Sequence, residues 1–275
     1  MRAFIAYPGT EGSFSWAAAR SVFADADYYG CSSFEETAAM VLSGQADYAL
    51  LPIENSFAGA VLNTYRILEN GALQMVGETL KRVEHQLLGV VGSSLSDIRT
   101  ITSHPQAIAQ CDEYLKTLHG VRLIPSENTA ISARMIAKNN DRTVAAIASR
   151  EAAEIYGLTI LKPDIHTSCQ NTTRFTIVSK LGIPLGHPNK ASVVFTVSNE
   201  VGALAKVLDS FAASGLNMTR IESRPIPETP FYYFFLGDFE GDVEAQRLHE
   251  AMEKAKKHTT QIRLLGIYPK GILND

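Results

Sequence analysis

The chain has 275 residues and a formal net charge of −4, with 45% hydrophobic and 20% charged residues. These values are ordinary for a globular protein of more than one domain, and they offer no basic face for nucleic acid or an anionic membrane. No apolar stretch approaches the ~20 residues of a membrane helix. Cys31, Cys111 and Cys169 are widely spaced, which predicts neither a disulfide framework nor a metal site and favours a reducing cytoplasm.

A short apolar run at residues 2–7 opens the chain. It predicts a strand and not a signal peptide, because it is brief and breaks at Pro8-Gly9. A glycine-bearing turn then leads into a helical pattern that starts at Phe14, with Ser13 as the expected N-cap. Free backbone N–H groups at such a junction attract anions, so Ser13 is a candidate binding residue.

The second polar junction follows an apolar strand pattern at residues 48–51. Glu54, Asn55 and Ser56 come next, before a helical pattern that runs through Leu68. Ligands of open α/β sheets bind at the carboxyl ends of strands, so all three side chains are candidates for a site. The alternative is that Asn55 or Ser56 merely caps a helix. It explains the presence of one of these polar residues well, but the presence of all three less well.

The third junction follows predicted strands at residues 73–80, 83–92 and 101–102. His85 lies on the second of these strands without a visible partner and is interpreted as structural. Ser103 precedes a helix on which Gln106 and Gln110, four residues apart, share a face. His104 and Cys111 are excluded as a nucleophile pair, because nothing in the pattern orients a base.

The pattern up to residue 180 alternates between strands and helices. The remaining predicted elements are a strand at 121–124, a helix from a polar cap at 126–129 through 136, a strand at 143–148, and a helix at 149–156 that stops at Gly157. This alternation predicts an α/β unit with mostly parallel strands.

Residues 171–175, Asn-Thr-Thr-Arg-Phe, lead into an apolar strand pattern at 176–178. A fixed guanidinium such as that of Arg174 can hold a carboxylate with two hydrogen bonds, and the neighbouring Thr173 hydroxyl can bond a leaving oxygen. Alone, the stretch also fits a polar loop with a surface arginine. Together with the polar helix starts, it favours a cleft for a small polyanion.

The pattern changes after a linker at residues 181–189, which holds two prolines and two glycines. The predicted elements are a strand at 192–198, a helix at 202–214, strands at 217–224 and 232–239, a helix at 243–257 and a strand at 261–268. This βαββαβ order is ferredoxin-like, and it carries no obvious catalytic group.

Several motifs, in order, carry a resemblance to a known family. They are Tyr7-x-Gly9-x-x-Gly12-Ser13-Phe14-Ser15, Pro52-Ile53-Glu54-Asn55-Ser56-x-x-Gly59-x-Val61, Ser103-His104-Pro105-Gln106 with Gln110-Cys111, and Thr173-Arg174-Phe175. The chain resembles the prephenate dehydratases across nearly its full length. Its tail resembles an ACT regulatory domain, with Gly202-Ala203-Leu204 and Glu222-Ser223-Arg224-Pro225 similar to two phenylalanine-binding motifs. Pro8, Thr10 and Ser13 depart from the family pattern, within the first glycine turn only.

The resemblance implies a fold and a reaction. The expected fold is α/β: a catalytic domain over residues 1–180, with two lobes and a cleft as in periplasmic binding proteins, and a ferredoxin-like ACT domain over residues 190–275. The expected enzyme is a cytoplasmic carbon–oxygen lyase of phenylalanine biosynthesis. It would convert prephenate to phenylpyruvate, with loss of CO2 and water, and would need no cofactor or metal because the ring becomes aromatic.

The resemblance also implies roles for individual residues. Thr173 would bond the leaving hydroxyl, Arg174 would clamp a carboxylate or brace its loop, and Glu54 would supply a proton or fix its loop. The residues expected to hold substrate oxygens and complete the anion cradle are Asn55, Gln110, Ser103 and Ser13. The residues expected to hold the allosteric effector L-phenylalanine are Gly202, Ala203, Leu204, Asn217, Met218, Glu222 and Ser223.

Further expectations concern partners and alternatives. The resemblance implies a homodimer or homotetramer that binds L-phenylalanine where two tail domains meet, without nucleic acid or membrane. The alternatives are an arogenate dehydratase, which takes the amino analogue of prephenate, and a non-catalytic protein that binds or senses a small acid.

Overall fold

The structure is a computed structural model that describes residues 2–168, 170–226, 232–243 and 245–274. The chain folds into two compact units. The first unit comprises Met1–Val61, Leu80–Phe175 and Leu273–Asp275, and the second comprises Leu62–Thr79 and Thr176–Ile272. None of the helices in the described residues combines the length and the apolar character that crossing a membrane requires.

The first lobe of the first unit is built on β1, whose residues Ile5 and Ala6 are fully buried. Its elements up to the second junction are β1 (Ala3–Pro8), α1 (Phe14–Val22), β2 (Ala26–Cys31), α2 (Phe34–Leu42), β3 (Tyr48–Asn55) and β4 (Gly59–Ala60). β1 pairs in parallel with β2 and β3, whereas β4 folds back antiparallel on β3.

Three further strands belong to the same sheet, whose order is β16-β5-β11-β3-β1-β2, with β4 beside β3. They are β5 (Gln74–Arg82), β11 (Thr172–Ser179) and β16 (Leu273–Asn274), and α3 (Leu62–Glu69) precedes β5 in the chain. The carboxyl end of β3 therefore lies beside β11, the strand that carries Thr173 and Arg174.

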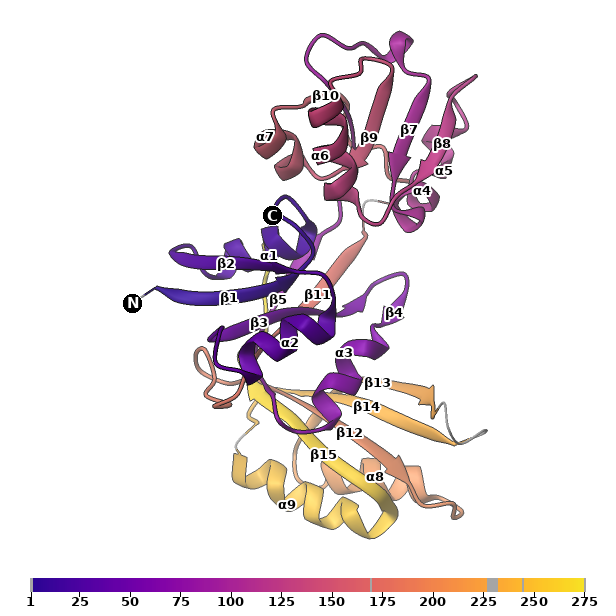
Figure 1. Ribbon diagram of the computed structural model, residues 1–275. Helices are drawn as coiled ribbons and strands as arrows, with labels where there is room; N and C mark the ends of the chain where they lie inside the picture. Colours follow the sequence, from indigo (N-terminus) through magenta and orange to yellow (C-terminus); the bar gives the residue numbers. More distant parts are fainter. Residues whose placement is uncertain (1, 169, 227–231, 244, 275) are drawn as a thin grey trace. The chain divides into compact units, whose positions relative to one another are not determined.

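The second lobe contains a five-stranded sheet with the order β10-β6-β9-β7-β8. Figure 1 labels β10, β9, β7 and β8 of this sheet. Its elements are β6 (Gln86–Gly89), a 3-10 turn (Leu95–Asp97), β7 (Thr100–Ser103), α4 (Pro105–Gln110), α5 (Asp112–Leu115), β8 (Arg122–Pro125), α6 (Thr129–Asn139), β9 (Val144–Ala148), α7 (Arg150–Tyr156) and β10 (Thr159–Lys162). β7 pairs in parallel with β8 and β9, but β6 pairs antiparallel with β9 and β10. The sheets are therefore mixed, where the sequence predicted mostly parallel strands.

The sequence pattern missed β2 and β10 for a physical reason. Residues of β2 before Cys31 are exposed or half-buried, and β10 has no buried residue. Neither strand therefore carries the continuous apolar run of a buried strand.

The starts of α1 and α6 agree with the predicted caps, whereas Ser149, predicted as the first residue of a helix, is the cap of α7. Side chains of Ser13, Asn128 and Ser149 accept hydrogen bonds from backbone N–H groups of α1, α6 and α7, respectively. At α4, His104 is the cap through its Nδ1, which accepts from the backbone N–H of Gln106. Gly157 ends α7 in the left-handed region with φ of 64°.

Residues 190–268, which belong to the second unit, show the predicted βαββαβ order. Their elements are β12 (Lys190–Val197), α8 (Ala203–Ala212), β13 (Asn217–Pro225), β14 (Tyr233–Glu240), α9 (Ala245–Ala255), a 3-10 turn (Lys256–His258) and β15 (Thr259–Tyr268). The strands form an antiparallel sheet with the order β13-β14-β12-β15. Phe211 of α8 stacks on Phe239 of β14 in its core, with ring centroids 4.3 Å apart.

Candidate active site

A cavity of about 250 Å³ in the first unit is lined by residues of both lobes. Its walls come from the end of β1, the start of α1, the end of β3, the segment before β6, α4, the start of α6 and the start of β11. Polar groups that line it include those of Ser13, Asn55, His85, Gln110, Asn128 and Thr173. The cavity is of a size that holds one small molecule and not a macromolecule.

Four of the seven expected catalytic residues share this cavity: Ser13, Asn55, Gln110 and Thr173. Glu54, Arg174 and Ser103 are not among the described residues that line it. Successive side chains of a strand point to opposite faces, so Thr173 and Arg174 on β11 cannot both face the same cavity, and the same holds for Asn55 and Glu54 on β3.

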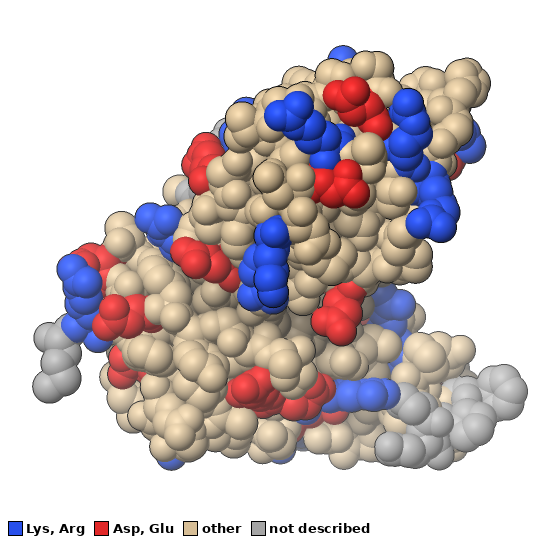
Figure 2. Space-filling model, turned by 45° about the horizontal axis from the view of Figure 1, so that its top comes forward, with Lys and Arg blue, Asp and Glu red and all other residues tan. Residues whose placement is uncertain are grey.

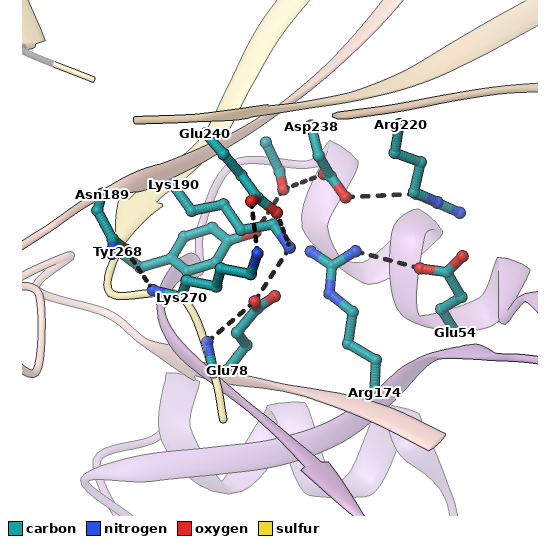
Figure 3. Close-up of polar contacts among 12 residues, drawn as sticks. Glu54, Glu78, Arg174, Asn189, Lys190, Arg220, Asp238, Glu240, Tyr268 and Lys270 are labelled. Atoms are coloured by element: carbon teal, nitrogen blue, oxygen red, sulfur yellow. Dashed lines mark hydrogen bonds and ion pairs between the residues drawn. The ribbon is translucent and has the colours of Figure 1, made fainter. Parts of the chain in front are cut away.

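The pair that turns away from the cavity forms an ion pair. Arg174, which is 7% exposed, places Nη1 3.2 Å from Oε2 of Glu54, and Figure 3 shows the two side chains reaching toward each other. Ser103 is fully buried, and its hydroxyl donates to the carbonyl of Ile147 at 2.7 Å. In this structure these three side chains join neighbouring strands.

Asn55 is the centre of a hydrogen-bond network that connects β3 with β11. Its amide nitrogen donates to Oδ1 of Asn171 at 2.8 Å and to the hydroxyl oxygen of Thr173 at 3.0 Å. Its amide oxygen accepts from the backbone N–H groups of Phe57 and Ala58 at 3.0 and 3.1 Å. Both amide protons and the amide oxygen are therefore used within the protein.

This arrangement determines what the Thr173 hydroxyl can do. Because its oxygen accepts from Asn55, its single proton is available for a different acceptor. No hydrogen bond donated by this hydroxyl occurs within the part of the chain that the structure describes, and Thr173 lines the cavity. The site therefore presents a hydroxyl donor of fixed position to whatever the cavity holds.

The sequence predicts a structural role for His85, but His85 lines the cavity together with Val83. Its Nε2 lies 2.8 Å from Oε1 of Gln110. Burial lowers the pKa of His85 to about 4, which outweighs the opposing effect of the Gln110 hydrogen bond, and nearby His166 lowers it further. The signal in the sequence was the two-residue spacing of Val83 and His85 on one face; its weakness was that the partner, Gln110, lies 25 positions away.

The low pKa of His85 predicts a loss of stability in acid. Between pH 6.5 and 4 the unfolded chain binds a proton at His85 that the folded chain does not, so the free energy of unfolding falls as the pH falls through this window. The expected loss is about 3 kcal/mol. Urea unfolding of the wild type and of His85→Gln at pH 7 and pH 4.5 measures it.

The control for that experiment is His119→Gln, which changes an exposed histidine. Other groups also titrate in this range. The test therefore compares the change in the free energy of unfolding between pH 7 and pH 4.5 in the wild type with the same change in each variant. An equal pH dependence in wild type and His85→Gln would contradict the assignment.

The cysteines of the described region do not offer a nucleophile. Cys31 and Cys111 are free and buried, and Cys169 lies outside the described residues. Burial raises the pKa of the Cys111 thiol to about 12, so this thiol stays protonated at neutral pH. Among the described residues, no group of three or more His, Cys, Asp or Glu side chains could hold a metal ion.

Charged residues of both signs are interspersed on the face of the molecule that Figure 2 shows. On the face shown in Figure 2, Lys and Arg side chains alternate with Asp and Glu side chains over the visible described surface. A polyanion would be attracted by local groups of the cavity and not by a general basic surface.

A second cavity, of about 790 Å³, lies in the second unit, beside the start of α8. Gly202, Ala203 and Leu204 line it, and Gly202 precedes the helix with a positive φ of 77°. The other residues expected to hold an effector are not among its described lining residues: Asn217, Met218, Glu222 and Ser223. Glu222 is ion-paired with Arg220 and Arg224, and Met218 packs against the core of the unit.

Comparison with known proteins adds independent evidence. The sequence model of the family described as prephenate dehydratase matches residues 5–182. The chain is 37% identical to arogenate dehydratase/prephenate dehydratase 2 of Arabidopsis thaliana, over 98% of this chain and 73% of that protein. It is also 37% identical to a bifunctional N-acyl-homoserine lactone acylase/prephenate dehydratase of Komagataeibacter europaeus, over 96% of this chain and 95% of that protein.

A solved structure agrees with these relatives. Prephenate dehydratase of Arthrobacter aurescens, solved in complex with L-Phe, superposes with a TM-score of 0.84 at 33% identity. The match covers 96% of this chain and 89% of that one, so the likeness extends over both units.

Proposed function

The chain belongs to the prephenate dehydratase family, and we propose that it converts prephenate to phenylpyruvate under feedback by L-phenylalanine. The observation that supports this reaction best is the Thr173 hydroxyl, which is held by Asn55 and left with a free proton in a cavity for one small molecule. Such a group can donate to an oxygen that gains negative charge as it leaves.

The chemistry demands little more than alignment. The electrons of the bond to the ring carboxylate move into the ring, CO2 departs, the carbon–oxygen bond to the ring hydroxyl breaks, and that oxygen leaves as water after taking up one proton. Aromatisation of the ring drives the reaction, so no redox cofactor is needed. Thr173 is a weak acid and therefore acts by donating a hydrogen bond or by relaying a proton from solvent.

Helix starts supply the attraction for a dianion. Ser13 and Phe14 at the start of α1, and Asn128 and Thr129 at the start of α6, all line the cavity. Backbone N–H groups and the positive end of the helix dipole at such positions stabilise carboxylates. We assign the two carboxylates of prephenate to these two helix starts.

The remaining candidates take supporting roles in this proposal. Arg174 and Glu54 brace β11 against β3 through their ion pair, which replaces the expected carboxylate clamp and proton source. Ser103 holds β7 to β9 through Ile147. Asn55 positions Thr173 and so does not bind the substrate itself. Of the two amides expected to hold substrate oxygens, only Gln110 keeps that role in the proposal.

We propose that residues 1–180 form the catalytic domain, with the two lobes of a periplasmic binding protein, and residues 190–275 an ACT regulatory domain. The cavity beside Gly202, Ala203 and Leu204 is the proposed L-phenylalanine site, completed where two copies of the domain meet in a homodimer or homotetramer. The complex of the Arthrobacter aurescens protein with L-Phe supports L-phenylalanine as the effector. Coupling between such sites is typically ~1–3 kcal/mol.

We place the enzyme in the cytoplasm, in keeping with the free thiols of Cys31 and Cys111.

The second candidate function is arogenate dehydration, which the name of the Arabidopsis thaliana relative favours. Arogenate differs from prephenate by an amino group in place of the side-chain ketone. Acyl transfer, the other half of the Komagataeibacter europaeus name, requires an activated nucleophile. Within the described residues of the cavity, no hydroxyl or thiol is hydrogen-bonded to a histidine side chain.

The deciding experiment supplies the purified full-length protein with prephenate and, separately, with arogenate. We expect phenylpyruvate from prephenate at neutral pH without added metal or cofactor, a higher kcat/KM for prephenate than for arogenate, and a change in rate on addition of L-phenylalanine. A higher kcat/KM for arogenate would select the alternative. Binding of prephenate without turnover would leave a non-catalytic sensor.

A further inference from the structure

His85 forms a contact that the proposed reaction does not yet use. Its side chain is 1% exposed, and it lies against the cavity with its ring edge-on to Phe14, at a centroid distance of 5.6 Å. Its backbone N–H donates to Nδ1 of His166, which fixes the start of the segment. The one hydrogen bond of its ring is the contact of Nε2 with Oε1 of Gln110 at 2.8 Å, among the described residues.

That contact and the surroundings of Nδ1 together favour one tautomer of the ring. With the carbonyl oxygen of Gln110 toward the ring, as in this structure, the proton of the neutral ring is on Nε2, because a carbonyl oxygen can only accept. The other ring nitrogen, Nδ1, is buried and has no partner among the described residues. A bare Nδ1 leaves one acceptor unsatisfied, whereas the opposite tautomer would bury an unsatisfied N–H donor and turn the amide of Gln110 around.

The same contact determines which end of Gln110 meets the cavity. Because the amide oxygen is held by His85, the amide nitrogen with its two protons is the end left for a ligand. The opposite orientation would present an oxygen, which repels the oxygens of a dianionic substrate. Asn55 has no amide proton to spare, so of the two amides expected to hold substrate oxygens, Gln110 is the one that we expect to donate to the substrate. Asn171 also lines the cavity, and its buried amide nitrogen has no partner among the described residues.

We propose that His85 is a positioning residue, whose Nε2–H holds the Gln110 amide so that its nitrogen donates to a substrate oxygen. The inference rests on the proposed function for the identity of the substrate. His85 does not act as an acid or base itself, because both ring nitrogens are enclosed by protein. Burial keeps the ring neutral at neutral pH, with a pKa of about 4, so the tautomer does not change in the working range.

The test compares three substitutions in the full-length protein. His85→Gln places an amide N–H near the position of Nε2, His85→Asn is too short to reach Gln110, and His85→Leu keeps the apolar volume without a donor. We expect kcat/KM for prephenate to fall about 10-fold or more in His85→Asn and His85→Leu, as the loss of one hydrogen bond to an anionic ligand predicts. We expect kcat/KM of His85→Gln to lie within about 3-fold of the wild-type value. The exposed control variant, His119→Gln, should have the wild-type kcat/KM.

A spectroscopic measurement tests the same inference without substrate. Nitrogen-15 NMR of the wild-type protein should show the His85 proton on Nε2 from pH 6 to pH 8. A proton on Nδ1, or His85→Gln no better than His85→Asn, would overturn the inference. If His85→Leu and His85→Asn fail to fold, two measurements still test the inference. They are the kcat/KM of His85→Gln relative to the wild type and the tautomer of His85 in the wild type. Failure of the wild type to turn over prephenate would overturn the proposed function instead, and the tautomer would still decide the positioning of Gln110.

Discussion

Replacement of Thr173 by alanine should lower kcat for prephenate by about 100- to 1,000-fold, the typical effect of removing one donor to a developing negative charge. The hydroxyl oxygen of Thr173 accepts from Asn55, so its proton points to another acceptor, which we assign as the leaving oxygen. KM should change little, because this hydrogen bond strengthens only as the bond to the leaving oxygen breaks. Steady-state kinetics of Thr173→Ala and of Thr173→Ser, which keeps the hydroxyl, measure both constants.

Asn55→Asp should be almost as harmful as Thr173→Ala, although aspartate has nearly the same shape as asparagine. An ionised carboxylate can only accept, so Thr173 would have to donate to it and could no longer donate to the leaving oxygen. The effects of Asn55→Asp and Thr173→Ala should therefore not add in the double variant, because both remove the same interaction.

The matched control is Asn70→Asp, an exposed change that keeps the Oδ1 acceptor used by the backbone N–H of Ala72. This variant should retain wild-type kinetics. Full additivity of the two site substitutions would contradict the positioning of Thr173 by Asn55, and wild-type turnover in Thr173→Ala would remove Thr173 from the mechanism.

Glu78→Ala should lower the free energy of unfolding by about 3–5 kcal/mol, because it leaves the buried ammonium of Lys190 without its nearest carboxylate. Nζ of Lys190 lies 3.0 Å from Oε1 of Glu78, and the two side chains are only 8% and 1% exposed. The same oxygen accepts from the backbone N–H of Gly271 at 3.0 Å, so a second, partly buried group loses its partner. Figure 3 shows these side chains together with Glu240, whose Oε1 lies 3.4 Å from Nζ of Lys190. Because Glu240 remains near the ammonium, it limits the loss of stability.

Two comparisons separate burial from charge in this prediction. Glu253→Ala removes the partner of Lys256 in an exposed pair and should change stability by less than about 1 kcal/mol. Replacing Glu78 and Lys190 together by methionine should restore much of the stability, since neither charge is then left alone. Urea unfolding followed by circular dichroism measures all three variants. A loss in Glu78→Ala as small as that in Glu253→Ala would refute the argument.

Local signals in the sequence were sufficient for much of the fold. The polar caps of α1 and α6, and the glycine that stops α7, depend on contacts within three or four residues, so the pattern predicts them directly. The apolar periodicity of residues 190–275 was enough to predict the βαββαβ order. The strands β2 and β10 escaped prediction because their sequences carry no continuous apolar run.

The candidate site divides in the same way. Sequence alone determined that polar residues gather at the starts of helices and the ends of strands, and therefore which segments meet at a cavity: Ser13, Asn55, Gln110 and Thr173 line one cavity. It could not decide which neighbour in each pair faces inward, because that depends on the register of β3 beside β11. The tertiary structure turned Thr173 inward and paired Arg174 with Glu54.

The hydrogen-bond partners of the site residues likewise depend on the tertiary structure. Asn55 meets Thr173 across 118 positions, and His85 meets Gln110 across 25. Whether an amide binds a ligand or orients another side chain depends on which partners have already taken its protons and its oxygen, and these partners are brought together only when the chain folds. The residue types with chemical potential were therefore readable from the sequence, while the role of each was decided by the folded neighbours of its polar atoms.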